Sequence, residues 1–189
     1  MKQPTPASER WTIRPYEPAD QPGVRALHDR TPPAGTLASA LPQRWPEDLD
    51  RIPELFGAFW VVTTDPDGQE IIGMAGVQEL DPKVPHHLLS DDGGRAQAIR
   101  LLRMRIAPEW QRRGIGSGLV ETVVEWAGES GYRSVILETT EQQEPAVALY
   151  RRHGFAEIGR SALGAYTLVW MRLDLDRARY GGVPRWTMR

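Results

Sequence analysis

The chain has 189 residues, of which 40% are apolar and 25% charged, a composition typical of one globular domain. Its net charge of −2 gives no general attraction to nucleic acid or to an anionic membrane, and no apolar run reaches the ~18–20 residues that a bilayer span needs. There is no cysteine, which excludes disulfides, thiol catalysis and zinc–thiolate sites. Because residues 1–10 contain no apolar signal segment, we expect a cytoplasmic protein without nucleic-acid or membrane partners.

The N-terminal part of the chain is expected to form a tail, a strand and a helix. Residues 1–9 are polar and contain prolines, which is typical of a frayed terminus. Residues 11–16 alternate apolar and polar side chains, as a half-buried strand does. Asp20 is a suitable N-cap for a helix that places Val24 and Leu27 on one face.

The next segment, residues 30–58, contains five prolines and is predicted to be a long, mostly irregular loop. Short helices are expected within it, around residues 37–41 and 48–56. β-branched and aromatic residues predict strands at 59–64 and 70–80, and Asp-Pro-Asp-Gly between them predicts the turn of a β-hairpin. The polar residues 81–96 are expected to form a second loop.

The strand predicted at 98–108 contains a break in its alternation. Ile99 and Leu101 are in phase with each other, whereas the apolar residues at 102, 104 and 106 have the opposite phase. Because a one-residue slip in a strand with one buried face requires an extra residue, we expect a β-bulge between Leu101 and Leu102.

The C-terminal half predicts the rest of an α/β domain. An apolar stripe from Leu119 to Ala127 predicts a helix that Gly131 ends. Strands are predicted at 133–140, 155–159 and 165–175, with a helix from Pro145 to Gly154. This order predicts one α/β (α+β) domain over residues 10–175, with a mixed sheet and helices on both faces, followed by a tail at 176–189.

The segment Gln-Arg-Arg-Gly-Ile-Gly-Ser-Gly, at 111–118, lies between the bulged strand and the next helix. Amides at a helix N-terminus bind anions, and glycines let the backbone approach a phosphate closely. A dinucleotide loop is an alternative, but Gly118 comes one residue too early for G-x-G-x-x-G, and three arginines in residues 99–106 do not suit a strand buried on both faces. The P-loop is excluded because no Gly-Lys-Ser/Thr follows.

Two segments resemble the GNAT N-acetyltransferase superfamily. Residues 111–116 match its acyl-CoA loop, Gln/Arg-x-x-Gly-x-Gly/Ala, and follow a hydrophobic-x-Pro step at 106–108. Residues 143–155 match its Asn-x-x-Ala-x-x-Leu-Tyr-x-x-x-Gly-Phe signature, except that Gln143 replaces the asparagine. The resemblance covers about residues 10–175 and is specific over 98–159.

The resemblance implies a splayed, mostly antiparallel sheet, acetyl-CoA as co-substrate and no metal. It also implies that Tyr150 protonates the departing CoA sulfur as general acid, and the usual pKa of tyrosine, near 10, suits that step. The residues that it assigns to acetyl-CoA are Met104, Arg105, Ile106, Gln111, Arg112, Arg113, Gly114, Ile115, Gly116, Ser117, Gln143 and Tyr150.

The general base stays open. Many members of the superfamily carry a glutamate where this chain has Arg100, which has no basic lone pair. Glu79 and Glu138, at the ends of the two neighbouring strands, are substitutes, and a chain of waters without a dedicated base is equally tenable. A non-catalytic acyl-CoA-binding sensor on the same fold therefore remains an alternative.

The acceptor is expected to be a primary amine. The two loops and the late strands carry acidic and aromatic residues, which suit a cationic small molecule, a polyamine or an aminoglycoside-like amine; a protein or peptide amine is the alternative. A homodimer through the last strand and the tail is also expected. The acceptor candidates are Trp45, Trp60, Glu79, Asp91, Asp92 and Trp170.

Overall fold

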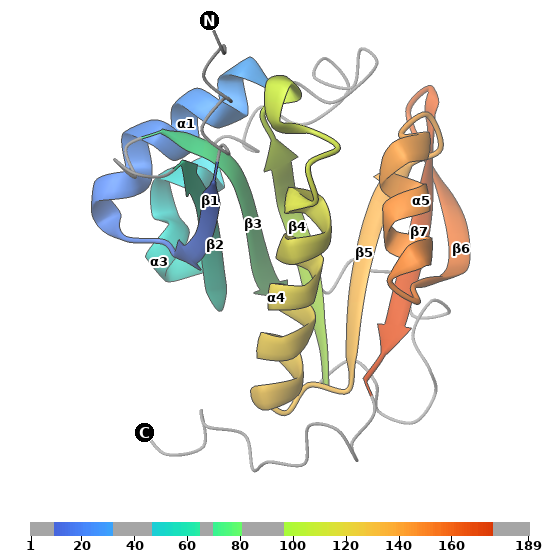
Figure 1. Cartoon of the computed structure of the whole chain (residues 1–189). Coiled ribbons are helices and arrows are strands. Elements are labelled where there is room, and N and C mark those ends of the chain that lie inside the picture. The colour runs from blue at the N-terminus through green and yellow to red at the C-terminus, as the bar shows by residue number, and fades with distance from the viewer. Residues whose placement is uncertain (1–9, 32–46, 65–69, 81–96, 176–189) are drawn as a thin grey trace, which may run out of the picture.

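A computed structural model describes residues 10–31, 47–64, 70–80 and 97–175. The two predicted tails, the helix near 37–41, the turn at 65–68 and the loop at 81–96 lie outside the described residues, as do Trp45, Asp91 and Asp92. The described part forms a seven-stranded sheet with the order β1-β2-β3-β4-β5-β7-β6 (Figure 1). The strands are β1 (Trp11–Pro15), β2 (Ala58–Thr64), β3 (Ile71–Glu79), β4 (Ala98–Ile106), β5 (Ser134–Thr140), β6 (Ala156–Leu163) and β7 (Tyr166–Asp174).

The sheet is mixed, as predicted, because one pair of neighbouring strands is parallel. β4 and β5 run in the same direction, whereas the remaining neighbours in the sheet are antiparallel. The last strand, β7, pairs with β5 on one side and β6 on the other, so both of its edges are occupied. An additional strand at this end of the sheet would therefore pair with β6, and the predicted homodimer stays a prediction.

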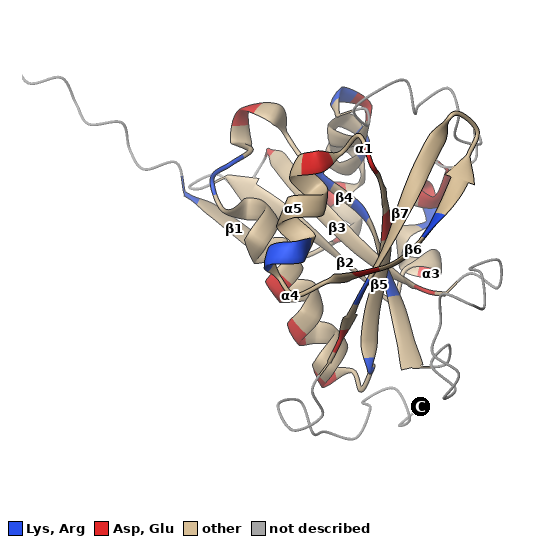
Figure 2. Cartoon of the chain, turned by 90° about the vertical axis from the view of Figure 1, so that its right-hand side faces the viewer, with Lys and Arg blue, Asp and Glu red and all other residues tan. Residues whose placement is uncertain are grey.

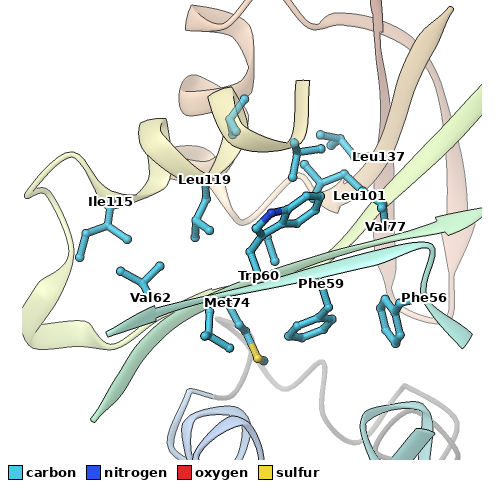
Figure 3. Packing of buried hydrophobic residues seen from close by; sticks show 14 of the residues in the cluster. Phe56, Phe59, Trp60, Val62, Met74, Val77, Leu101, Ile115, Leu119 and Leu137 are labelled. Carbon is cyan, nitrogen blue, oxygen red and sulfur yellow. The ribbon is translucent and has the colours of Figure 1, made fainter. Parts of the chain in front are cut away.

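Helices cover both faces of the sheet. α4 (Ile115–Glu129) and α5 (Glu144–Arg152) lie on one face, and α1 (Gln21–Arg30), the 3-10 helix Glu47–Arg51 and α3 (Ile52–Leu55) lie on the other (Figures 1 and 3). The apolar stripe of α4 is buried as its spacing predicts, with Leu119, Val120 and Val123 fully inaccessible. This stripe packs on the central strands and forms the main core.

Trp60 belongs to that core and not to an acceptor site. Its ring lies edge-on to Trp126 of α4, with 5.7 Å between ring centroids, and only 6% of the residue is exposed (Figure 3). The sequence position suggested acceptor binding because an aromatic residue beside a long loop has no local mark of burial. Here the sheet face that Trp60 occupies is covered by α4, so its role is packing.

Of the two predicted helix-end signals, Gly131 ends α4 as expected, whereas Asp20 does not cap α1. Gly131 has φ 83° and follows the last turn of α4, and the Tyr132 N–H donates to the Ala127 carbonyl at 3.0 Å, as in a Schellman motif. Asp20 precedes α1 but its carboxylate does not cap that helix. It binds Arg14 at 2.6 and 2.7 Å and accepts the Glu17 N–H, and the Arg14 guanidinium lowers the pKa of Asp20.

Candidate active site

A cleft opens between β4 and β5 because their pairing stops early. The two strands pair only from Ala98 to Arg100 on β4 and from Ser134 to Ile136 on β5, and beyond these residues they diverge (Figure 1). The resulting cleft has a volume of about 240 Å³. Its lining includes β4 residues 100–105, the end of β5, Gln143, Tyr150 and the β6–β7 residues Leu163, Leu168 and Trp170.

A β-bulge in β4 accompanies the divergence, as predicted, although it lies two residues further along the strand. Gly76 of β3 pairs with Leu102 and Met74 pairs with Arg105, so Arg103 and Met104 together lie opposite one residue. Arg103 has φ 58°, the left-handed value that is uncommon outside glycine and common at bulges. The predicted position was wrong because it took every arginine of the strand as outward-facing, whereas Arg103 is buried.

Arg103 is buried because it has a partner 55 residues away in sequence. Its Nε and Nη2 donate to the two carboxylate oxygens of Asp48, at 2.9 and 2.7 Å. The Arg103 side chain is 4% exposed, and burial lowers the pKa of Arg103 and raises that of Asp48. The 3-10 helix that carries Asp48 thus packs a carboxylate beneath the bulge. Nothing in the local sequence marks this pair, and it was not predicted.

The glycine-rich segment lies at the N-terminus of α4. Gly114 precedes the helix with φ 87°, and Arg112 also has a left-handed φ of 60°. The backbone N–H groups of the first turn of a helix have no partner within the helix. A left-handed residue next to a right-handed one makes successive N–H groups point toward the same side, where an anion can bind. The segment therefore has the backbone geometry of an anion-binding site, and the positive end of the helix dipole adds to it.

The glycines of this segment are required for two structural reasons, the backbone angle at one position and close packing at the other two. A Cβ on Gly114 would meet nothing within 4 Å, so this position needs glycine for its backbone angle. A Cβ on Gly116 would lie 3.1 Å from the Leu149 side chain, and one on Gly118 would lie 3.0 Å from Ile13. These two glycines let α4 approach α5 and β1 closely.

The side chains of the two arginines and Gln111 lie around the loop. Arg112 is exposed. The Arg113 guanidinium lies 4.8 Å from the Trp110 ring centroid, which fixes one positive charge beside the helix N-terminus. The Gln111 amide donates to the Ile106 carbonyl at 3.2 Å and ties the loop to the end of β4.

Tyr150 projects from α5 into the lining of the cleft. The residue is 7% exposed, and its ring packs against Phe155 with 5.7 Å between centroids. Burial raises the pKa of Tyr150 well above its usual value, the charge of Glu138 raises it further, and Arg105 opposes the shift. The hydroxyl is therefore protonated at physiological pH and is a hydrogen-bond donor.

The two candidate bases have different surroundings. Glu138 lines the cleft but forms a two-pronged ion pair with Arg100, in which Arg100 Nε lies 3.0 Å from Glu138 Oε2. Glu79 is exposed at the end of β3, pairs in register with Ile99, and is not among the residues that line the cleft. Burial raises the pKa of Tyr132 and the charge of Glu79 raises it further, which puts Glu79 near Tyr132, just after the C-terminal end of α4.

The end of β5 contributes two threonines that were not predicted as site residues. Thr139 donates to the side-chain oxygen of Gln143 at 3.1 Å, which holds that longer amide at the start of α5. The hydroxyl of Thr140 is buried without a partner among the described residues. Trp170, a predicted acceptor residue, does line the cleft and donates to Ser161 at 2.8 Å. The threonines belong to no motif, and only the sheet order brings β7 beside them.

No cluster of three or more potential metal ligands occurs among the described residues. In the same part of the chain, no helix has both the length and the apolar character that crossing a membrane requires. Figure 2 shows basic residues on β4 and also on other strands of the sheet.

Fold and site together describe an α/β protein with one seven-stranded sheet, in which β4 and β5 diverge beside the glycine-rich N-terminus of α4 (Figure 1). The model of the acetyltransferase (GNAT) family matches residues 22–155, which is most of the chain. The chain therefore belongs to the acetyltransferase (GNAT) family, and the resemblance noted in its two signatures is confirmed.

Curated relatives are named N-acetyltransferases. The chain is 33% identical to human N-acetyltransferase 8 over 115 residues, which are 61% of this chain and 44% of that protein. It is 29% identical to human N-acetyltransferase 8B over 128 residues, which are 67% of this chain and 49% of that protein. The chain thus spans less than half the length of these two relatives.

Solved structures share the fold. Arabidopsis thaliana NAA60 in complex with acetyl-CoA superposes with a TM-score of 0.69 at 20% identity, covering 88% of this chain and 99% of its own. The Escherichia coli ribosomal-protein-S18-alanine N-acetyltransferase gives a TM-score of 0.61 at 20% identity, covering 88% and 95%. At this identity the likeness establishes the architecture, and the predicted fold class is confirmed.

Proposed function

We propose that the chain is an acetyl-CoA-dependent N-acetyltransferase that transfers an acetyl group to a primary amine. One observation supports the proposal: Tyr150 lines the cleft between β4 and β5, and the glycine-rich N-terminus of α4 lies beside the end at which these strands diverge (Figure 1). The names of the curated relatives and the acetyl-CoA in the NAA60 structure support it. An acetyl-CoA molecule has a charged pyrophosphate and a long uncharged arm, and these two features match the loop and the cleft.

The loop at 111–117 would hold the pyrophosphate. Backbone amides from Arg112 to Ser117 converge on the anion, the Ser117 hydroxyl adds a donor, and Arg112 and Arg113 add positive charge. The pantetheine arm lies along β4 past Met104 and Ile106, whose backbone groups no longer pair with β5. Tyr150 of α5 and Gln143, the residue before this helix, flank the arm.

The reaction forms a bond from the amine nitrogen to the acetyl carbon and breaks the bond from that carbon to sulfur. Tyr150 donates its hydroxyl hydrogen to the departing sulfur, and the proton that the nitrogen loses restores it through water. Because Glu138 is paired with Arg100, a water chain is a more accessible route for that proton than direct abstraction. Glu79 and Glu138 remain the carboxylates to test.

A second function, acyl-CoA sensing without turnover, is favoured by one observation. The position at which the superfamily often carries a free glutamate is occupied by Arg100, whose partner Glu138 is committed to an ion pair. A sensor keeps the loop and the cleft but has no group to accept the proton of the amine.

Thermal unfolding with acetyl-CoA, CoA and NAD separates these functions from a dinucleotide-binding one. We expect acetyl-CoA and CoA to raise the melting temperature and NAD to leave it unchanged. In a separate assay with acetyl-CoA, we expect the protein to release CoA when an amine is added. An acetyl-CoA shift without turnover of any amine would support the sensor. Absence of an acetyl-CoA shift would rule out both.

Gly114→Ala is expected to weaken acetyl-CoA binding. A left-handed backbone angle costs a non-glycine residue about 1–2 kcal/mol, so alanine favours a loop whose amides point elsewhere. Asparagine tolerates this angle better, so Gly114→Asn should bind more tightly than Gly114→Ala. Titration calorimetry with CoA measures the order of the three proteins. Equal affinity for all three would show that the angle at residue 114 does not shape the site.

A further inference from the structure

We propose that the acceptor amine carries a carboxylate near its amino group, and that the Arg105 side chain binds this carboxylate. The inference rests on the proposed acetyltransferase function and names the substrate class of the same cleft. It differs from the expectation of a polyamine or aminoglycoside acceptor, which came from the composition of two loops and the late strands, and it assigns the Arg105 side chain, expected at the acetyl-CoA site, to the acceptor.

The charges around the cleft do not balance. The charged residues that line it are Glu138 and three arginines at 100, 103 and 105. Arg100 is neutralised by Glu138, and Arg103 is neutralised by Asp48. Among the described residues, no carboxylate lies within ion-pair distance of Arg105. The described lining is thus left with one uncompensated positive charge, which repels a second ammonium group and attracts an anion.

The Arg105 guanidinium has more N–H donors than its bond to the Thr31 carbonyl uses. Its Nη1 donates to the Thr31 carbonyl at 3.0 Å, next to the end of α1. A guanidinium has five N–H donors in a fork that fits a carboxylate, and the bond to Thr31 leaves most of the fork for a ligand. The Thr31 bond fixes the side chain in place, so little ordering is needed when a carboxylate binds.

The surroundings of Arg105 show the cost of its unpaired charge. Burial lowers the pKa of Arg105 to about 10, with a further contribution from Arg103, and the group stays charged at neutral pH. His28 supplies no counter-ion, since a histidine is neutral or cationic, and burial together with the charge of Arg105 lowers its pKa. A carboxylate from the substrate would supply the missing counter-ion.

Arg105 also lies near the reacting centre. Arg105 and Tyr150 line the same cleft, and the charge of Arg105 opposes the upward shift that burial gives the pKa of Tyr150. Both residues line one cleft of about 240 Å³. An amine attacking beside Tyr150 while its carboxylate binds Arg105 is therefore a small amino acid or a compound of similar spacing.

The test compares matched acceptors on the wild-type protein. L-phenylalanine, L-glutamate and β-alanine are each paired with the corresponding carboxamide, with putrescine and spermidine as cationic comparators. Rates are compared at equal concentrations of neutral amine, because the carboxamides lose their proton more easily. At least one acid should exceed its carboxamide, and both polyamines, by about 10- to 100-fold in kcat/KM.

Three variants assign the preference to a residue. Arg105→Gln should reduce it to within about threefold, mainly through a higher KM for the acid, and Arg105→Lys should retain part of it, since lysine keeps the charge but not the fork. Arg51→Gln removes an exposed arginine that is paired with Glu54, and it should leave the preference unchanged. CoA-induced thermal shifts check that each variant is folded.

The outcomes separate this inference from the proposed function. Faster acetylation of carboxamides or polyamines than of every acid overturns the Arg105 assignment and leaves the acetyltransferase proposal standing. An acid preference that survives in Arg105→Gln, or acetyl-CoA binding without turnover of any acid, also overturns it. Absence of acetyl-CoA binding overturns both.

Discussion

Tyr150→Phe is expected to lower kcat by about 10²–10⁴-fold, the usual contribution of a positioned general acid. The substitution removes only the hydroxyl, and the ring keeps its contact with Phe155. The melting temperature and the CoA-induced shift should therefore stay close to the wild-type values. Steady-state CoA release with a saturating acceptor measures the effect.

The matched control for this prediction is Tyr132→Phe. Tyr132 packs on Trp126, its neighbour Glu79 is not part of the cleft lining, and loss of its hydroxyl should leave kcat within about twofold. If Tyr150→Phe also stays within twofold, the tyrosine is a packing residue and the sulfur is protonated by another group.

The pH dependence gives an independent check on Tyr150. Because its pKa is raised in the folded protein, the hydroxyl stays protonated through the range in which activity is measured. Wild-type kcat should show no loss from tyrosine ionisation between pH 7 and about pH 10, the usual tyrosine pKa. A decrease near pH 9 that disappears in Tyr150→Phe would contradict the raised pKa.

Asp48→Ala is expected to have the largest effect on stability, about 3–5 kcal/mol of unfolding free energy. It removes the Asp48 carboxylate from the buried Arg103 guanidinium, at the bulge that shapes the cleft. The pKa of Asp48 is raised and that of Arg103 lowered mainly by burial, so desolvation is already costly for both groups. Urea denaturation of the wild type and the variant measures the difference.

Asp50→Ala provides the control on the same 3-10 helix. Asp50 also pairs with an arginine, Arg25 at 2.6 Å, but its side chain is 56% exposed. Exposed ion pairs contribute about 0–1 kcal/mol, so the loss should be several-fold smaller than for Asp48→Ala. Equal losses in the two variants would show that the buried position of Arg103 is not what makes its pair important.

Much of the fold followed from local patterns. The strands at 59–64 and 70–80, the α4 stripe and its end at Gly131 are where periodicity and turn residues put them. Each of these signals depends on residues that are near one another in sequence. The existence of the bulge was also predictable, because a strand with one buried face can change its phase only by accommodating an extra residue.

Contacts between distant parts of the chain could not be predicted from these local patterns. Trp60 was assigned to the acceptor site and is core, and the bulge was placed before Arg103 instead of at it. Both errors have one cause: burial of a tryptophan or an arginine depends on which distant element packs against it. α4 covers Trp60, and Asp48 neutralises Arg103.

The sequence by itself determined the family, the fold class and the loop with anion-binding geometry, because those features are carried by short, ordered motifs. Only the tertiary structure decided the charge of the cleft. Arg100, Arg103 and Arg105 look alike in sequence, yet two are paired with carboxylates and the third has none among the described residues. Which arginine has a partner depends on contacts between distant parts of the chain, and those contacts decide which kind of acceptor the cleft attracts.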